Sequence, residues 1–336
     1  MEYYSGLDVS LEETFITIID QNGEIVKEQV VQTSSYEIFK YLQDTNLEYK
    51  KIGIESGQFS ISLCKELVSK GLPVICVDAR AMAKALSARI NKNDKNDALG
   101  IAQMMRANLY KEVKIKSDDS CELKVILGTR NQLKASKQQI MGTVRGLLKI
   151  YGLKIPAKSQ KFILKVREAI ANLSRINIRA IESTLDSLES VQRSIDDLDD
   201  IIEEYCRNDE DCRLLMTIPG VGVITAITYK SGLDDPNRFT DSETVGAYMG
   251  LTPRQYASGE INRQGSISKM GSKDVRTSLY EAAQSLLIVS KKKSKIKSWG
   301  MKIMKKKGAK KAIVAVARKL AVVMHRMLIS RREFCY

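Results

Sequence analysis

Histidine is nearly absent from this sequence, and its cysteines are scattered. His325 is the only histidine in 336 residues, and none of the six cysteines forms a CxxC pair. Zinc sites need such residues in clusters at short spacing, so no zinc site is expected. A single histidine in a basic C-terminal segment also argues against histidine acid–base chemistry. Any metal site must therefore be built from carboxylates, which suit Mg²⁺ or Mn²⁺.

The sequence also lacks a signal peptide, an apolar run of membrane length and a GxxxxGK[ST] nucleotide-binding loop. These absences predict a cytosolic protein with free thiols and no membrane partner, whose chemistry needs no ATP motif. Aromatic residues are few at 6%, but hydrophobic residues reach 43%, which is ordinary for a soluble protein with real cores.

Positive charge is concentrated in the last third of the chain. Residues 1–112 hold 13 Lys and Arg against 16 Asp and Glu, a net charge of −3. Residues 113–212 hold 17 against 16, net +1, and residues 213–336 hold 24 against 8, net +16. This distribution predicts three parts, of which the last is a polyanion-binding domain joined to a chemically different N-terminal domain.

The first 112 residues predict a mixed α/β fold. Three strands in hairpin succession come first, and two short apolar strands then alternate with helices. The strands are expected at Tyr3–Val9, Thr14–Asp20, Glu24–Val31, Lys51–Glu55 and Pro73–Val77. Helices are expected over 35–47, 61–70 and 79–90, and another starts near residue 94. This order suggests a ribonuclease H-like sheet.

Four carboxylates have informative positions in this domain. Asp8 lies on the first strand and Glu55 ends the fourth, while Asp94 and Asp97 share one face of a helix start. Four acids cannot sit close together ionised unless cations neutralise them. A pair of Mg²⁺ ions would do so and would hold the attacking and leaving oxygens of a phosphodiester in line.

Capping is the alternative role for these acids, because an Asp at a strand end or helix start usually serves a turn or a cap. Asp20 and Asp78 also end strands. We assign Asp20 to the hairpin turn and Asp78 to the cap of the following helix.

The middle of the chain predicts two long helices, over 117–153 and 160–208. In the second helix apolar residues from Ile181 to Ile202 recur in steps of three and four, close to a heptad seam. An antiparallel helical hairpin and an intermolecular coiled coil both fit this pattern. We favour a coiled coil that builds a homo-oligomer, because a seam this long needs a partner surface.

The C-terminal third is expected to be mainly helical. Leu214–Tyr229 predicts two short apolar helices joined by Pro219-Gly220-Val221-Gly222. This pattern resembles the helix-hairpin-helix element, whose turn presents backbone amides to a DNA phosphate. Gly220 and Gly222 are thus candidate nucleic-acid contacts, although a structural turn has the same pattern. Helices are also expected over 274–290 and 312–328, where His325 has a packing or capping role.

Residues 250–273 have the composition of a binding loop and not of a core. Glycines interrupt the segment, and cations and serine hydroxyls lie between them. Such a loop lets amides and cations approach a phosphate chain closely, and any of its hydroxyls could be a nucleophile. The candidate phosphate ligands are Arg254, Arg263, Lys269 and Lys273.

Eleven lysines and no acid occupy residues 291–311, with Trp299 among them. A charge run is usually a solvated tail, but helices are predicted on both sides of this one. It is therefore interpreted as a phosphate-binding surface with sequence-independent, salt-sensitive affinity. The residues singled out are Lys291, Lys292, Lys293, Lys305 and Lys306.

Together these motifs resemble the transposases of the 110/1111 family of bacterial and archaeal insertion sequences. The resemblance rests on GLDVS with Asp8, IES with Glu55, and NDKNDA with Asp94 and Asp97. It also rests on the C-terminal run IPGVG…YMGLTPRQYASGE…GSISKMG, which is the most specific part. The motifs occur in the family's order over nearly the whole chain.

The resemblance implies a RuvC-like N-terminal domain, a long helical coiled coil and a transposase domain. The family's metal-binding DEDD set carries over to the four acids above, and its catalytic serine maps to Ser258 in YASGE, with Ser266 and Ser268 as rivals. It also implies a bridge RNA that pairs with double-stranded donor and target DNA, and dimers that build a tetramer with composite active sites. The protein would be cytoplasmic in a prokaryote and associated with the nucleoid during transposition.

The resulting hypothesis is a DNA transposase in which Ser258 attacks the scissile phosphate and forms a covalent phosphoserine. Two alternatives remain open on the residues alone. In the first, the chain is a metal-dependent, structure-selective endonuclease of the resolvase type, in which water attacks and Ser258 only binds phosphate. In the second, it is a nucleic-acid-binding scaffold whose acids are caps.

Overall fold

The computed structural model describes residues 1–86, 93–156, 161–258 and 261–335, which form two compact units. The first unit spans Met1–Lys116 and the second spans Ser117–Tyr336. The division lies close to the predicted boundary at residue 112, whereas residue 212 falls inside the second unit. The helical middle and the C-terminal third therefore pack as one body, and their separation by function stays a prediction.

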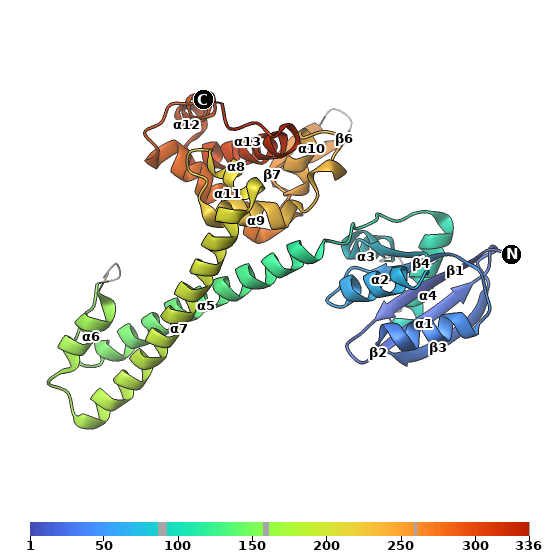
Figure 1. Ribbon diagram of the computed structural model, residues 1–336, viewed down its shortest axis with the longest axis horizontal. Helices are drawn as coiled ribbons and strands as arrows, with labels where there is room; N and C mark the ends of the chain where they lie inside the picture. The colour runs from blue at the N-terminus through green and yellow to red at the C-terminus, as the bar shows by residue number, and fades with distance from the viewer. Residues whose placement is uncertain (87–92, 157–160, 259–260, 336) are drawn as a thin grey trace. The chain divides into compact units, whose positions relative to one another are not determined.

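A five-stranded mixed sheet lies at the centre of the first unit (Figure 1). Its strands are β1 (Tyr3–Val9), β2 (Glu13–Ile19), β3 (Ile25–Gln32), β4 (Tyr49–Glu55) and β5 (Val74–Val77). They lie in the order β3-β2-β1-β4-β5, with β1, β2 and β3 antiparallel and β4 and β5 parallel to β1. The predicted succession of strands is thus confirmed.

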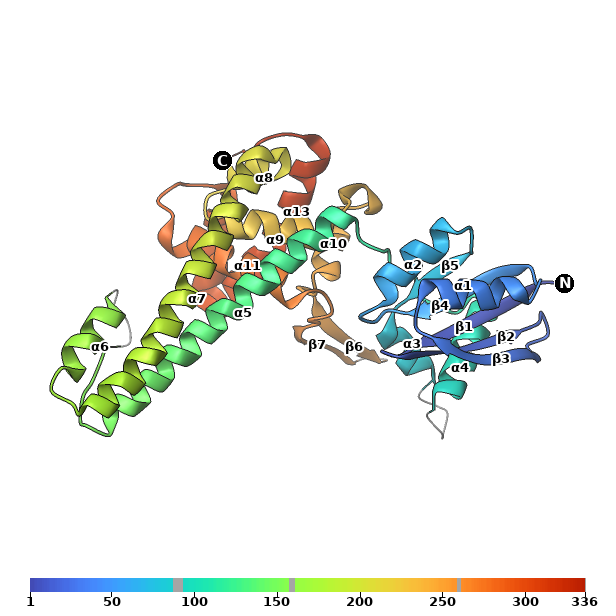
Figure 2. The ribbon, with the colours of Figure 1, turned by 60° about the horizontal axis from the view of Figure 1, so that its bottom comes forward.

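Helices cover both faces of this sheet (Figure 2). They are α1 (Ser35–Asp44), α2 (Ser60–Ser69), α3 (Ala79–Leu86) and α4 (Asp94–Ala107). Because side chains alternate along a strand, Leu7 packs with α1 and α2 on one face, whereas Tyr4 packs with α3 and α4 on the other. The predicted α/β class is confirmed for this unit, and the continuation of α3 toward residue 90 lies outside the described residues.

The second unit begins with a helical hairpin. It consists of α5 (Asp118–Lys149), α6 (Phe162–Ile170) and α7 (Arg175–Asn208). The long helices α5 and α7 run side by side in both views, and Arg130 of α5 forms an ion pair with Asp199 of α7. The prediction of one helix over 160–208 is wrong, because α6 ends at Ile170 and Ser174 caps a new helix by accepting the amide of Asn177.

The apolar seam of α7 is covered from within the chain. Ile181, Leu185 and Leu188 form a buried cluster with residues of α5 and α6. Ile202, farther along, belongs to the main core of this unit. The seam therefore has an intramolecular partner, as in the helical-hairpin alternative, and it does not by itself call for an intermolecular coiled coil. Oligomerisation would need a different surface of the chain.

Further helices and a β-hairpin complete the second unit. They are α8 (Glu210–Met216), α9 (Val223–Leu233), η1 (Pro236–Arg238), α10 (Glu243–Tyr248), β6 (Pro253–Ser258), β7 (Ile261–Ile267), α11 (Lys273–Gln284), η2 (Ser285–Val289), α12 (Lys295–Lys307) and α13 (Ala309–Ser330). Buried faces of α9, α11 and α13 form the centre of the largest core. His325 of α13 is 1% exposed, and its two ring nitrogens meet the Ser242 hydroxyl at 2.7 Å and the Pro236 carbonyl at 2.8 Å. The packing role predicted for His325 is thereby confirmed.

Among the residues that the structure describes, none forms a helix that is both long and apolar enough to span a membrane.

Candidate functional site

The first two predicted acids lie on neighbouring strands of the sheet. Leu7 of β1 pairs with Ile54 of β4 in parallel register, so Asp8 and Glu55 follow at the same level on the two strands. Each stands two residues after a glycine that faces α4, so both acids lie on the α4 face of the sheet, and both side chains are half-buried. The register therefore places these two carboxylates beside each other at the carboxyl edge of the sheet.

Two glycines let α4 lie close to these strands. A methyl group on Gly6 would overlap the carbonyl oxygen of Ala98 and lie 2.5 Å from the amide nitrogen of Ala102. On Gly53 it would lie 2.5 Å from a methyl carbon of Ile101. Gly6 and Gly53 each precede one of the acids by two residues. These glycines could have predicted the contact from the sequence, because a glycine inside a strand often marks the close approach of another backbone.

The direction of α4 brings its first turn to the same edge. Near the other end of the helix, the Lys51 ammonium donates to Asn108 at 2.7 Å, and Lys51 lies near the start of β4. From the Gly6–Ala98 crossing, four helical residues back to Asp94 cover about 6 Å. Two strand residues forward to Asp8 cover about 6.6 Å. The backbone thus brings Asp94 and Asp97 toward the edge that carries the first two acids.

The carboxylates that the structure describes at this edge are suitable ligands for a divalent cation, but their side chains do not converge on one point. The donors are carboxylate oxygens, which suit Mg²⁺ and Mn²⁺. Asp97 is half-buried and Asp94 is exposed. Within the described part of the chain, no three Asp, Glu, His or Cys side chains are arranged to share an ion. The backbone collects the residues, and binding would require their side chains to turn toward one another.

The two acids assigned to turns and caps have those roles. Asp78 accepts the amides of Arg80 at 3.0 Å and Ala81 at 2.9 Å, which caps α3. Asp20 accepts the amide of Glu24 at 2.9 Å and the amides of the turn residues before it. The Glu24 amide and its neighbours hold the pKa of Asp20 below its ordinary value. Capping therefore accounts for these two carboxylates.

The segment predicted as a glycine-rich loop is mainly a β-hairpin, which corrects the loop interpretation. Strands β6 and β7 pair antiparallel, with Tyr256 opposite Arg263 and Ser258 opposite Ile261. Ser258 is the last residue of β6, next to residues 259–260, which lie outside the described part of the chain. Arg254 and Arg263 are exposed on the hairpin. The glycines of this segment suggested a loop, but the residues of β6 and β7 pair with each other along 253–267 and form a hairpin.

Two glycines of this motif serve the base of the hairpin. A methyl group on Gly250, whose φ is +70°, would lie 2.6 Å from the amide nitrogen of Met270. On Gly271 it would overlap the carbonyl oxygen of Tyr248. Lys269 adopts a φ of +57° and donates its amide to the Gly250 carbonyl at 3.0 Å. These glycines therefore bring two protein backbones together, and a phosphate is not needed to explain them.

The turn between α8 and α9 contains the two glycines assigned to nucleic acid. Gly220 has a φ of +91° and packs against α11 and η2, where a methyl group would lie 2.8 Å from the Ala282 carbonyl oxygen. Gly222 is exposed, and no atom lies within 4 Å of a methyl group placed there. Packing accounts for Gly220, whereas the surroundings of Gly222 leave room for a ligand at the start of α9.

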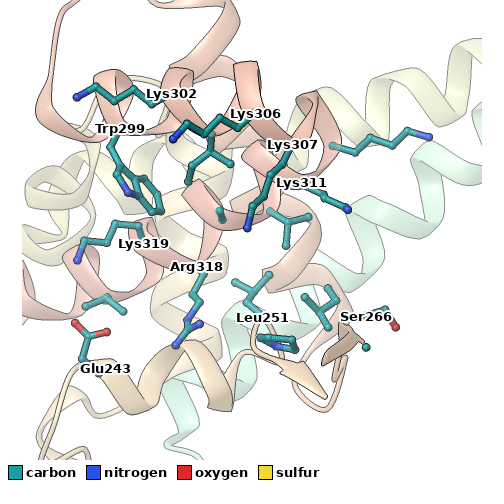
Figure 3. A pocket seen from close by; sticks show the side chains of 18 residues that line it. Glu243, Leu251, Ser266, Trp299, Lys302, Lys306, Lys307, Lys311, Arg318 and Lys319 are labelled. Atoms are coloured by element: carbon teal, nitrogen blue, oxygen red, sulfur yellow. The ribbon is translucent and has the colours of Figure 1, made fainter. Parts of the chain in front are cut away.

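A cationic hollow lies beside the hairpin, between α10, β7, α12 and α13 (Figure 3). Its volume is about 940 Å³. We call it the lysine groove. Apolar side chains and Trp299 lie among the cations that line it, and Glu243 is the one acid among the described residues of the lining. The cations are Lys302, Lys306, Lys307, Lys310, Lys311, Arg318 and Lys319.

Of the predicted cations, only Lys306 lines this groove. Lys305 lies beside it on α12, and Lys291, Lys292 and Lys293 precede that helix in an exposed segment. Lys273 is exposed at the start of α11. The lysine run predicted a basic surface. It did not predict that the cations gather between α12 and α13, because Arg318 and Lys319 lie beyond the run. The helical spacing of cations after residue 311 could have revealed it.

Comparisons with known proteins give one consistent result. A family model described as "Transposase IS116/IS110/IS902 family" matches residues 212–298, and a second transposase model, named for a DEDD motif and IS110, matches residues 5–152. The transposase for insertion sequence element IS1111A of Coxiella burnetii is 26% identical over 334 residues, covering 98% of this chain and 90% of that protein. A pilin gene-inverting protein of Moraxella bovis is 28% identical, covering 76% of this chain and 71% of that protein.

Among solved structures, the RuvC protein of Thermus thermophilus aligns with 33% of this chain and 99% of its own, at 13% identity and a TM-score of 0.26.

Proposed function

The chain belongs to the IS110 family of insertion-sequence transposases and is thus a DNA-processing enzyme, and we propose that it recombines DNA through a covalent phosphoserine at Ser258. The observation that carries the catalytic proposal is the convergence in the first unit. Register places Asp8 beside Glu55, and two glycines let α4 bring its acidic first turn to the same edge. The helix dipole can account for Asp94 and Asp97 in the first turn of α4, but it does not account for the approach of that turn to Asp8 and Glu55.

The nucleophile is proposed from its place in the hairpin. Ser258 ends β6 beside the connection to β7, and the exposed cations Arg254 and Arg263 lie on the same hairpin. In the reaction the Ser258 oxygen bonds to phosphorus and its proton is lost, while the bond from phosphorus to the 3′ oxygen breaks and that oxygen is protonated. After strand exchange the 3′ hydroxyl attacks the phosphoserine, and the serine regains a proton. The number of phosphoester bonds is unchanged, so no ATP is needed.

The carboxylates have a separate task. Asp8, Glu55, Asp94 and Asp97 would hold Mg²⁺ or Mn²⁺, whose charge stabilises a phosphate as it is attacked. These acids and Ser258 belong to different compact units of the chain. The proposal is therefore compatible with composite sites in a dimer or tetramer, in which one subunit supplies the acids and another the serine.

Donor and target DNA, and a bridge RNA that selects them by pairing, are the proposed nucleic-acid partners. The surplus of cations in residues 213–336 supports a polyanion at this end of the chain. The exposed turn at Gly222 is a proposed contact of helix-hairpin-helix type. The inverting activity named for the Moraxella bovis relative also supports rearrangement of DNA and not cleavage alone.

The decisive experiment traps the covalent intermediate. Cells carrying the element with its flanking DNA are denatured rapidly, and DNA that remains attached to the protein is measured. Native protein should give an adduct that Ser258→Ala abolishes, while nucleic-acid binding is retained. Ser266→Ala, a change to an exposed serine on β7, is the matched control and should keep the adduct.

Two results would redirect the assignment. Recombination without an adduct, lost on Asp8→Ala, would make water the nucleophile, as in a resolvase-type endonuclease. An adduct that persists in Ser258→Ala and disappears in Ser266→Ala would move the nucleophile to β7.

A further inference from the structure

The lysine groove combines a cationic surface with an apolar one. Its cations surround an apolar lining that includes Leu251, Ile267 and Ile303. Glu243, the acid in the described part of the lining, forms an ion pair with Arg326 at 3.0 Å, so it does not neutralise the groove's cations. A ligand for this groove must therefore carry several negative charges and also present apolar surface.

Trp299 occupies a central place in this surface. It is the only tryptophan in the chain and is 43% exposed. Figure 3 shows its indole ring directed into the groove beside Lys302 and Lys306. A second hollow of about 520 Å³ lies on the other part of α12 and is lined by Lys293, Lys295 and again by Trp299 and Lys302. Trp299 and Lys302 thus line both cationic hollows.

Duplex DNA satisfies only half of this description. It presents its phosphates outward and keeps the faces of its bases stacked inside, so the apolar lining and the indole would have nothing to contact. A single strand can place phosphates on the lysines and turn its bases toward the lining. Aromatic side chains in cationic grooves bind single strands in this way, because every base has a face that can stack.

We propose that the lysine groove binds unpaired nucleotides and that Trp299 stacks on one of their bases. The inference deepens the proposed function, because strand exchange and RNA–DNA pairing both expose unpaired nucleotides. The charge of the groove selects a polyanion, and the exposed indole selects one with planar apolar groups. An acidic amphipathic helix also combines charge with apolar surface, and it serves as the competing ligand in the test.

The test uses the emission of Trp299, which reports this site alone because the chain has no other tryptophan. Full-length Ser258→Ala protein is titrated with a single-stranded oligothymidine, with a duplex of equal length and with an abasic strand of equal charge. The oligothymidine should quench the emission, whereas the other two should bind without comparable quenching. A peptide of residues 195–208, which carries the acidic face of α7, should neither quench it nor displace the strand.

Variants separate stacking from charge. Trp299→Ala should weaken single-strand binding by about tenfold, since one stacked base contributes roughly that factor, and should leave duplex affinity within about twofold. Trp299→Phe keeps a ring and should recover most of the affinity. Met301→Ala on the same helix, which lines neither hollow, is the matched control and should bind like the parent.

Three outcomes would overturn the inference: equal quenching by duplex, unchanged affinity of Trp299→Ala for the single strand, or displacement of the strand by the acidic peptide. The proposed phosphoserine chemistry and the proposed single-strand binding can fail independently of each other. Binding is measured on a protein without the proposed nucleophile, so loss of the phosphoserine model would leave quenching intact. Conversely, absence of quenching would leave the covalent adduct test unaffected.

Discussion

Gly6 of β1 and Ala98 of α4 lie so close that a methyl group on the glycine would overlap the alanine carbonyl oxygen. This contact fixes the depth at which α4 packs on the sheet. Because the first turn of α4 carries Asp94 and Asp97, the same contact also fixes how near these acids come to Asp8. Gly6, which has no reactive side chain, thereby positions the acids of the proposed metal site.

Gly6→Ala should displace α4 and destabilise the first unit by about 3 kcal/mol, the upper range for overpacking a tight contact. The obstruction is backbone, which cannot rotate away as a side chain can. Hydrogen exchange of the amides of β1 and α4 would measure the effect. Gly57→Ala is the control, since the nearest atom to its methyl group would be 3.9 Å away. Native protection of α4 in Gly6→Ala would refute the proposed contact.

The four acids should bind a divalent cation jointly. Asp8→Asn and Glu55→Gln keep the side-chain shapes but remove charge, so Mn²⁺ affinity should fall by about 100-fold or more, beyond the 10–100-fold typical of groups outside the ligand shell. Calorimetric titration of the full chain with Mn²⁺ measures this directly. Nucleic-acid binding should persist in both variants, because the C-terminal cations are untouched.

Asp78→Asn supplies the matched control for that experiment. Asp78 follows β5 as Glu55 ends β4, but its carboxylate caps α3. The change should lower stability by no more than about 1 kcal/mol, because asparagine is also a good cap, and Mn²⁺ affinity should not change. If Asp78→Asn loses the ion as readily as Asp8→Asn, the metal site has been placed among the wrong carboxylates.

Local patterns predicted the first unit well. The short apolar runs predicted the strands in their correct order, and the turn at Asn22-Gly23 predicted the hairpin between β2 and β3. The acids were found because each stands at a strand end or helix start, which is a local property. Gly6 and Gly53 were not recognised as the cause of their convergence, because a close contact between β1 and α4 is not local.

The second unit shows where local reasoning fails. The α7 seam correctly indicated a buried stripe, but the seam could not reveal that α5 and α6 of the same chain cover it. Glycines in residues 250–273 suggested a loop, although Gly250 and Gly271 lie at the crossing below a hairpin. In both cases the sequence indicated that a segment makes a close contact, but it did not show which part of the chain the segment contacts. Arg318, which lies just beyond the lysine run in sequence, joins the groove through the packing of α12 against α13.

Self-association should involve the end of the helical hairpin where α5 ends and α7 begins. Ile150 is 75% exposed and Ile176 is 81% exposed, and Leu164 of α6 is exposed as well. Exposed apolar side chains gathered at one end of a helical pair are candidates for burial against a second copy. Ile150→Glu with Ile176→Glu should reduce the mass measured by light scattering from that of the dimer or tetramer to that of the monomer.

Val125→Glu tests whether that effect is specific. Val125 is also on α5 and is 69% exposed, but it lies toward the opposite end of the helix. This variant should keep the native mass. A monomeric native protein, or equal loss of mass in both variants, would argue against assembly through this end of the hairpin.

The ion pair between Asp209 and Lys230 should make the second unit sensitive to acid. It links the start of α8 to α9, and Tyr205 of α7 accepts a hydrogen bond from Lys230 at 3.0 Å. Burial alone would raise the pKa of Asp209, but hydrogen bonds from Lys230 and the Cys212 amide outweigh it, so the pKa lies below its ordinary value. The pair therefore stabilises the fold above the unfolded pKa of about 3.9, and this contribution is lost as pH falls through the lower folded value.

Asp209→Asn keeps an oxygen for capping α8 and removes the charge, so it should cost about 2 kcal/mol at neutral pH. The difference from native protein should shrink as the pH falls below about 4, because Asp209 then takes up a proton on unfolding, and it should vanish once the pH lies below the lower folded pKa, where the folded carboxylate is protonated as well. Urea unfolding at neutral pH and below about pH 4, followed by the fluorescence of Trp299, measures the stability of this unit. Asp211→Asn, whose ion pair with the exposed Arg331 lies at the surface, should change stability by at most about 1 kcal/mol. A cost for Asp209→Asn that is the same at both pH values would mean that the carboxylate acts as a cap and not as a charge.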